Sequence, residues 1–248
     1  MKAIKLLLIL YAGILLHCSN EFPRIHYTPK EDSNSGVNLC KEKEREGSID
    51  EGYYCDPQDG EVRIDECKKK SVSYDINEEF CDVRDGQVYK YKLIGTQTWM
   101  AQNLNYDTER TNSRCYDNID ENCEEYGRLY EWDVALKVCP PGWHLPSTDE
   151  WLILENNVNF IYTVEQALKT KEGWDNNGNG EDYYGFSALP GGYCIINTCD
   201  QSKRIGRWWT SNELDNSNAF YYQLSYNGKI RGALLKEYFY SVRCVKDN

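Results

Sequence analysis

One acidic and asparagine-rich stretch, residues 175–182, carries the side chains most suggestive of chemistry. Calcium takes roughly six to eight oxygen ligands, and alternate residues of a tight loop containing glycine can supply several. Asp175, Asn177 and Asn179 place oxygen atoms at positions one, three and five of such a loop, and Gly180 is at position six. An EF-hand then requires glutamate at position twelve, where this chain has Phe186. Two interpretations stay open. The pattern favours a turn between a helix and a strand, and the alternative is a calcium site formed by Asp175, Asn177, Asn179 and Asp182.

His144 is the clearest candidate for acid–base catalysis, within Trp-His-Leu-Pro-Ser. A Ser-His-Asp catalyst needs an activated serine, such as one on a Gly-x-Ser-x-Gly elbow, and the sequence has no such motif. His144 is therefore predicted to hydrogen-bond locally and to order its loop. Carboxylates are abundant, but no glycosidase pair stands out by its context. We predict no catalytic residue.

Aromatic side chains offer a different chemistry, because their faces stack on sugar rings and their polar tips hydrogen-bond. All seven tryptophans follow residue 98, which places the packed domain in the C-terminal part. Trp208 and Trp209 are adjacent in a predicted strand, so they point to opposite faces, and one can be core while the other is exposed. The candidate ligand contacts are Tyr183, Tyr184, Trp208 or Trp209, Asn212, Glu213 and Tyr221.

The N-terminus predicts export. Basic residues at the start precede an apolar segment over Leu6 to Leu16, which is too short for a membrane-spanning helix of about 20 residues. Leu15-Leu16-His17-Cys18 resembles the lipobox of bacterial lipoproteins, in which the cysteine is lipidated and becomes the first mature residue. His17 stands where a small residue is usual, and the alternative is ordinary signal cleavage nearby with loss of Cys18. Ser19 after the cysteine favours an outer-membrane location.

The charge of the chain restricts its partners. Its formal net charge is −12, which repels phosphate backbones and anionic headgroups. We therefore expect no nucleic-acid partner, and membrane contact through the lipid anchor only. Neutral polysaccharide, protein and a divalent cation remain open.

The 11 cysteines indicate disulfides in an exported chain, and ten remain after Cys18. Structural zinc is disfavoured because the chain has three histidines and no Cys-x-x-Cys pair. A weak repeat relates residues 54–62 to residues 80–88, and each copy has another cysteine upstream. Four cysteines allow three pairings. If repeats pair alike, the bridges are Cys40–Cys55 and Cys67–Cys81.

A flexible tether over residues 18–39 and a cysteine-rich stalk over residues 40–82 precede the domain that contains the predicted helices and strands. In the domain over residues 83–248, two short strands surround a turn at Gly95, and helical spacing predicts a helix over residues 126–137. Capping boxes at Ser147 and Thr163 begin two more helices, the first ending near Asn156. Strands are predicted at residues 186–189, 207–210, 219–224, 230–235 and 241–245. Helices early and strands late indicate an α+β fold.

Several blocks in this domain resemble one bacterial family, the Fibrobacter succinogenes major paralogous domain. They include residues 85–90, 94–106, 126–130, 139–146, 185–193, 208–211 and 241–245, in order and along the whole domain. The resemblance implies a C-type-lectin-like fold related to the formylglycine-generating enzymes. Such a fold has two or three short helices and small twisted antiparallel sheets, here preceded by a disulfide-linked segment. Members are extracytoplasmic and often lipoproteins, and share no established activity.

Related enzymes use reactive thiols, but here the resemblance leaves none free. Cys139 and Cys244 flank the domain as its closing bridge would, Cys115 and Cys123 bracket a polar loop, and Cys194 and Cys199 bracket a short insertion. We therefore expect a non-catalytic binding or adhesion module on the cell surface, for an extracellular polysaccharide. The alternative is a structural or protein-interaction component of the cell envelope. A hydrolase is less favoured.

Overall fold

The computed structural model describes residues 52–56, 62–108, 112–196, 198–226 and 228–247. All of them belong to one compact unit over residues 37–248. The predicted export signal, Cys18, the tether and Cys40 lie outside the described residues. Among the described residues, no helix combines the length and the apolar character needed to cross a bilayer.

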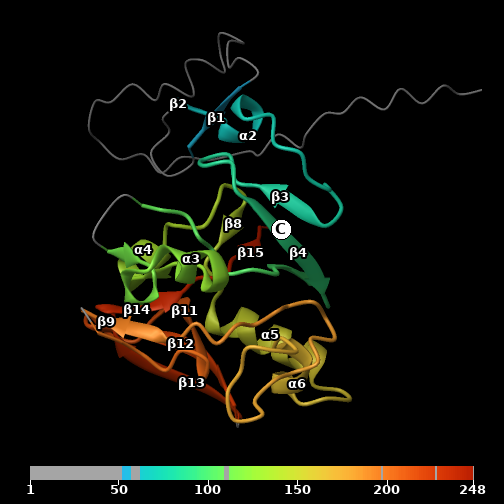
Figure 1. Ribbon diagram of the computed structural model, residues 1–248, viewed down its shortest axis with the longest axis vertical. Coiled ribbons are helices and arrows are strands. Elements are labelled where there is room, and N and C mark those ends of the chain that lie inside the picture. Colours follow the sequence, from blue (N-terminus) through green and yellow to red (C-terminus); the bar gives the residue numbers. More distant parts are fainter. Residues whose placement is uncertain (1–51, 57–61, 109–111, 197, 227, 248) are drawn as a thin grey trace, which may run out of the picture. The chain divides into compact units, whose positions relative to one another are not determined.

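The larger sheet is mostly antiparallel, and its longest strands lie next to one another (Figure 1). Its path runs β10 (Thr198–Asp200), β9 (Tyr193–Ile195), β14 (Tyr238–Ser241), β11 (Ile205–Glu213), β12 (Asn218–Ser225), β13 (Gly228–Leu235). A side pair, β6 (Ser113–Arg114) and β7 (Leu129–Tyr130), joins it through β14. β11 pairs with β12 on one side and with β14 on the other, so it is an interior strand. The strands predicted near residues 207, 219 and 230 are confirmed as β11, β12 and β13.

A smaller sheet has the order β3 (Glu79–Cys81), β4 (Val88–Ile94), β5 (Gln97–Met100), β15 (Val245–Lys246), β8 (Trp143–His144). The predicted turn joins β4 to β5, where Gly95 has a φ of +62° and packs against the Asn157 side chain. β3 comes from the segment predicted as a stalk, so the sheet begins before residue 83. The hairpin of β1 (Tyr53–Cys55) and β2 (Val62–Ile64) is a separate two-stranded sheet, followed by α2 (Glu66–Lys69).

Both predicted capping boxes are present, at the starts of α5 (Thr148–Val158) and α6 (Val164–Leu168). The predicted helix over residues 126–137 is wrong. The chain instead forms α3 (Asp120–Tyr126), then β7, then α4 (Trp132–Ala135), with a 3-10 turn over Tyr116–Asn118 before α3. The helix stops because Gly127 has a φ of +76° and Leu129 then pairs with β14. The strand predicted at residues 186–189 is also wrong, since only an isolated bridge joins Ala188 to Lys169.

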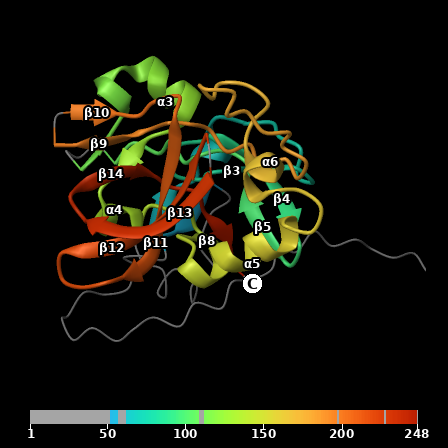
Figure 2. The same cartoon turned by 90° about the horizontal axis from the view of Figure 1, so that it is seen from below.

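Helices cover both faces of the larger sheet. Trp208 packs in a cluster with α5 and α6, whereas Trp209 packs in a cluster with α4. Because adjacent strand residues point to opposite faces, the two clusters lie on opposite sides of β11. α5 contacts α6, β11 and β12. Figure 1 shows the yellow helices α5 and α6 next to the orange and red strands, and Figure 2 gives the view from below. The fold is therefore α+β, as predicted.

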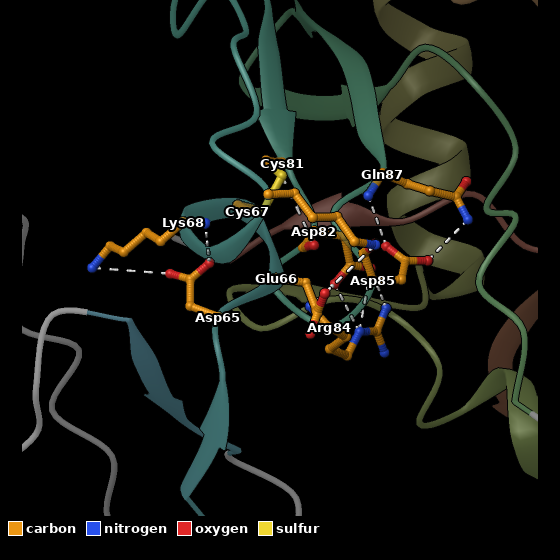
Figure 3. The surroundings of a disulfide bond; sticks show 10 residues. Asp65, Glu66, Cys67, Lys68, Cys81, Asp82, Arg84, Asp85 and Gln87 are labelled. Carbon is orange, nitrogen blue, oxygen red and sulfur yellow. Dashed lines mark hydrogen bonds and ion pairs between the residues drawn. A yellow bond between two sulfur atoms is a disulfide. The ribbon is translucent and has the colours of Figure 1, made fainter.

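Four disulfides link the described residues: Cys67–Cys81, Cys115–Cys123, Cys139–Cys244 and Cys194–Cys199. Each is a pair that the sequence analysis expected. Cys55 is also disulfide-bonded, and its expected partner, Cys40, lies outside the described residues. The Cys67–Cys81 bridge connects α2 to β3 (Figure 3) and so attaches the N-terminal segment to the smaller sheet.

Candidate binding pocket

A pocket of about 400 Å³ lies where the β1–β2 hairpin meets α4 and the chain after β5. This volume is within the range of small-ligand sites. The N-terminal segment, meaning here the described residues 52–84, lines it with Tyr54, Asp56, Arg63 and Arg84. The rest of the domain supplies the polar residues Tyr106, Thr108, Asn112, Asp133 and Lys137, and the apolar residues Val134 and Val138.

Arg84 forms a buried part of the pocket wall. Its side chain is 8% exposed, and Nη2 lies 2.6 Å from Oδ2 of Asp82, which is fully buried. Nη1 donates to the Val138 carbonyl at 2.9 Å, and the guanidinium lies over the Tyr106 ring at 4.0 Å. Burial opposes the charge of Arg84, but the hydrogen bonds to Asp82 raise the pKa of its guanidinium. Arg84 thereby ties the N-terminal segment to the domain.

A turn after β3 holds Arg84 in place (Figure 3). The Asp85 carboxylate accepts from the backbone N–H of Gln87 and from its side-chain amide, both at 2.9 Å. Burial raises the pKa of Asp85. The Gln87 amide also donates to the Asn105 carbonyl at 3.1 Å, immediately before Tyr106. The turn therefore fixes both the arginine and the tyrosine beneath it.

The hairpin contributes a second ion pair. Nε of Arg63 lies 2.9 Å from Oδ2 of Asp56, and their side chains are 44% and 14% exposed. Tyr54 is directly opposite Arg63 in the antiparallel register. Burial, and then the nearby Asp56 carboxylate, raise the pKa of the Tyr54 hydroxyl. This hydroxyl therefore stays protonated and can donate a hydrogen bond at neutral pH.

The domain side of the pocket holds an unused acceptor. The buried Oδ1 of Asn112 accepts no hydrogen bond from any described residue. Such an atom is costly unless a ligand or water satisfies it. The pocket is thus lined by donors and acceptors in nearly balanced numbers. Its charges are balanced too, because Arg63 and Arg84 each have a carboxylate partner.

Trp208, Trp209 and Tyr221 do not form a contact surface, which corrects the sequence prediction. Both tryptophans have 0% exposure, because α4 covers one face of β11 and α5 covers the other. Their indole N–H groups donate to buried acceptors, Trp208 to Oδ1 of Asn103 and Trp209 to the Tyr130 carbonyl, both at 2.8 Å. Tyr221 is also buried, in the same cluster as Trp209.

The other predicted ligand contacts lie at the surface but do not line the pocket. Tyr183 is 51% exposed and stacks on Tyr162 with a centroid separation of 3.9 Å, while Tyr184 is half-buried against the core. Asn212 accepts from the backbone N–H of Thr148 at 2.7 Å, at the start of α5. Glu213 lies 3.1 Å from the ammonium of Lys236.

The residues proposed for calcium participate in the hydrogen bonds of a loop. Oδ1 of Asn179 accepts from the Trp174 backbone at 3.0 Å. The two carboxylate oxygens of Asp182 accept from the backbone and hydroxyl of Ser187, at 2.8 and 2.7 Å. Within the ranges that the structure describes, no three His, Cys, Asp or Glu side chains gather as a metal-binding group. Calcium binding by Asp175, Asn177, Asn179 and Asp182 stays a prediction.

His144 makes the local hydrogen bonds expected of a residue that orders its loop. Its Nε2 lies 2.8 Å from Glu150 and its Nδ1 lies 2.6 Å from Asp247. Both ring nitrogens are therefore occupied by carboxylates.

Sequence reasoning missed the pocket because its residues come from separate segments. One signal was present. The repeat aligns Tyr54-Cys55-Asp56 with Phe80-Cys81-Asp82, and both aspartates hold arginines that line the pocket.

Fold and site together define an α+β, disulfide-linked protein with a charge-balanced polar pocket. Residues 93–246 match the family described as the Fibrobacter succinogenes major domain, and the chain belongs to this family. No curated protein and no solved structure matches the chain. Tyr54, Asp56, Arg63 and Arg84 all precede the matched range.

Proposed function

We propose that this protein is an extracytoplasmic, lipid-anchored binding module whose pocket takes a neutral sugar of an extracellular polysaccharide. The observation that carries the proposal is the pairing of Arg63 with Asp56 and of Arg84 with Asp82 around one pocket. For residues 93–246 we propose the C-type-lectin-like fold implied by the family resemblance. The proposed location rests on the export signal and lipobox ending at Cys18.

Sugar hydroxyls donate and accept hydrogen bonds at once. A wall of paired arginines and carboxylates presents donors beside acceptors, whereas an ionic ligand would have to disrupt one of the pairs. The Asn112 oxygen adds an acceptor, and the Tyr54 ring adds an aromatic side chain. Aromatic rings pack against the apolar faces of sugars. The chemistry of the pocket therefore suits a neutral sugar.

One observation favours the second candidate function, a protein-interaction component of the envelope. Phe160 and Ile161, in the loop between α5 and α6, are 86% and 81% exposed. Adjacent bulky apolar side chains at this exposure are typical of contact sites. This function predicts binding that depends on Phe160 and not on the pocket.

Retention of the mature protein on insoluble cellulose and xylan, with and without chelator, tests the proposal. Soluble oligosaccharides of the retained polymer then give a dissociation constant by calorimetry. Asn112→Ala is expected to weaken binding about tenfold while leaving the melting temperature unchanged, because this acceptor makes no hydrogen bond in the described protein.

The variant Asp133→Asn tests the side of the pocket that also holds Asn112. Asp149→Asn, which lies outside the pocket, is the matched control. No retention on any neutral polysaccharide would overturn the proposal. Retention that is lost in Phe160→Ser but kept in Asn112→Ala would also overturn the proposal. The protein-interaction function would then replace it.

A further inference from the structure

Arg207, in the interior strand β11, is a half-buried cation that lacks an acidic partner. Its Nε donates to Oε1 of Gln223 at 2.8 Å, and its Nη1 donates to the Tyr240 hydroxyl at 3.1 Å. Both acceptors are neutral, and the described part of the chain offers Arg207 no carboxylate. A guanidinium has five N–H donors, so most of those on Arg207 stay available for a ligand.

Three tyrosine rings from neighbouring strands hold this guanidinium in position. Its Cζ lies 4.4, 4.8 and 5.1 Å from the ring centroids of Tyr193, Tyr221 and Tyr240. Contacts between a cation and an aromatic ring stabilise the cation without neutralising its charge. The rings therefore fix the place of Arg207 on the sheet and leave its full positive charge to attract an anion.

Polar atoms of this cluster reach the surface. Nη2 of Arg207 and the hydroxyls of Tyr193 and Tyr238 make no hydrogen bond to a described residue, and none of these three atoms is buried. The Tyr193 and Tyr238 rings lie 6.0 Å apart on the adjacent strands β9 and β14. Asp200, opposite Tyr193 in the next strand, is already engaged by the backbone and the side-chain amide of Gln201. One face of the sheet thus presents a cation beside two free hydroxyls.

We propose that Arg207, Tyr193 and Tyr238 bind a sugar that carries a carboxylate, at a second site that shares no residue with the pocket. A planar guanidinium holds a carboxylate through two parallel N–H bonds. A phenol hydroxyl donates and accepts hydrogen bonds, as a sugar hydroxyl does. The arginine therefore recognises the acid group, and the two tyrosines recognise the hydroxyls of the same sugar.

The charge of the chain restricts the polymer to which this sugar belongs. A net charge of −12 repels a polymer that is charged at every unit. Arg207 is a single unpaired cation and neutralises a single carboxylate. The ligand is therefore a largely neutral polysaccharide that carries isolated uronic acids.

The test uses a xylo-oligosaccharide that carries one glucuronic acid, and the same oligosaccharide after reduction of its carboxyl group to a primary alcohol. Calorimetry on the full mature chain should show about tenfold tighter binding of the acid. Arg207→Gln should remove this preference, and Arg207→Lys should keep only part of it, because lysine cannot bind a carboxylate through two parallel bonds. Tyr193→Phe and Tyr238→Phe should each weaken binding of the acid roughly fivefold.

Arg231→Gln is the matched control, because Arg231 is exposed and lies beside Tyr222, on the opposite face of the sheet. Melting curves verify folding, and the two phenylalanine variants keep the rings that pack around Arg207.

Equal binding of the acid and the reduced sugar by the wild type would overturn the proposal, as would a preference that survives in Arg207→Gln. Tighter binding of a peptide with one aspartate, lost in Arg207→Gln, would also overturn it and assign the site to a protein partner. The proposed function is tested separately, with neutral polysaccharide and variants in the pocket, so either can fail while the other stands.

Discussion

The Nε2 atom of His144 lies 2.8 Å from Oε1 of Glu150, and this contact joins the strand β8 to the first turn of α5. Hydrogen bonding to Glu150 raises the pKa of His144 to about 9. Burial alone would raise the pKa of Glu150, but hydrogen bonds from His144 and Ser147 lower it to about 2. The imidazolium and the carboxylate are therefore both charged over a wide pH range.

The stability of the fold should follow these two titrations. The contribution of His144 is complete below its ordinary pKa of 6.5 and is lost as the pH rises through about 9. The contribution of Glu150 is complete above its ordinary pKa of 4.5 and is lost as the pH falls through about 2. The pair is partly exposed, so we expect about 1 kcal/mol or less. Melting temperatures of wild type and His144→Gln should differ at pH 6 and converge near pH 10. An equal difference at both pH values would contradict the ion pair.

Arg243 should be among the positions most sensitive to a conservative substitution. Its guanidinium has 0% exposure and donates to Asn103 at 2.7 Å and to the Phe186 and Ser187 carbonyls. Burial lowers its pKa, and no ion pair to it is found within the described ranges. Lysine cannot replace this planar set of donors. Arg243→Lys should lower the free energy of unfolding, measured in urea, by roughly 3 kcal/mol. The exposed control Arg231→Lys should lower it by less than about 0.5 kcal/mol. Equal stabilities of the two variants would refute this role.

The disulfides should contribute according to the loops they close. Cys139–Cys244 spans 105 residues and Cys115–Cys123 spans 8. A disulfide that closes a longer loop restricts the unfolded chain more. Replacing both cysteines by alanine should therefore lower the free energy of unfolding by about 4.7 kcal/mol for Cys139–Cys244 and by about 2.5 kcal/mol for Cys115–Cys123. Denaturant unfolding of the double variants Cys139→Ala/Cys244→Ala and Cys115→Ala/Cys123→Ala measures both. The opposite order would show that effects in the folded state dominate.

Millimolar calcium should leave the melting temperature unchanged. The Asn179 oxygen and both Asp182 oxygens already accept hydrogen bonds within their loop, and a cation would have to displace Ser187 and the Trp174 backbone. The measurement is a calcium titration after chelator treatment, with magnesium as the control. A rise in melting temperature that occurs with calcium but not with magnesium, and that Asp182→Asn removes, would establish the metal site instead.

Ser147→Ala should weaken α5 selectively. The Ser147 hydroxyl accepts from the Glu150 backbone at 3.2 Å, and Glu150 accepts from the Ser147 backbone at 2.7 Å. Loss of such a cap costs about 1 kcal/mol. Because Trp151 follows directly and is fully buried, its fluorescence should report the loss in chemical denaturation. Asp149→Ala, at an exposed position of the same turn, is the control that retains the cap, and an equal loss there would deny the capping box its role.

Local features of this chain were predictable from neighbouring residues. The capping boxes at Ser147 and Thr163 need only residues three positions apart, and the turn at Gly95 needs only a glycine between two short apolar runs. Short-range hydrogen bonds form whatever the rest of the chain does. The same is true of the Cys67–Cys81 pair, which closes a small loop.

Tertiary structure decided the remainder. The periodicity over residues 126–137 resembled a helix, yet Leu129 and Tyr130 became a strand because β14 offers them backbone partners. Alternation placed Trp208 and Trp209 on opposite faces of β11, as the sequence determined, but only the packing of α4 and α5 buried both. The pocket combines Arg63, Arg84 and Asn112 from segments that meet only after folding. Local sequence determines the direction of a side chain, whereas its burial and its partners depend on which distant elements pack against it.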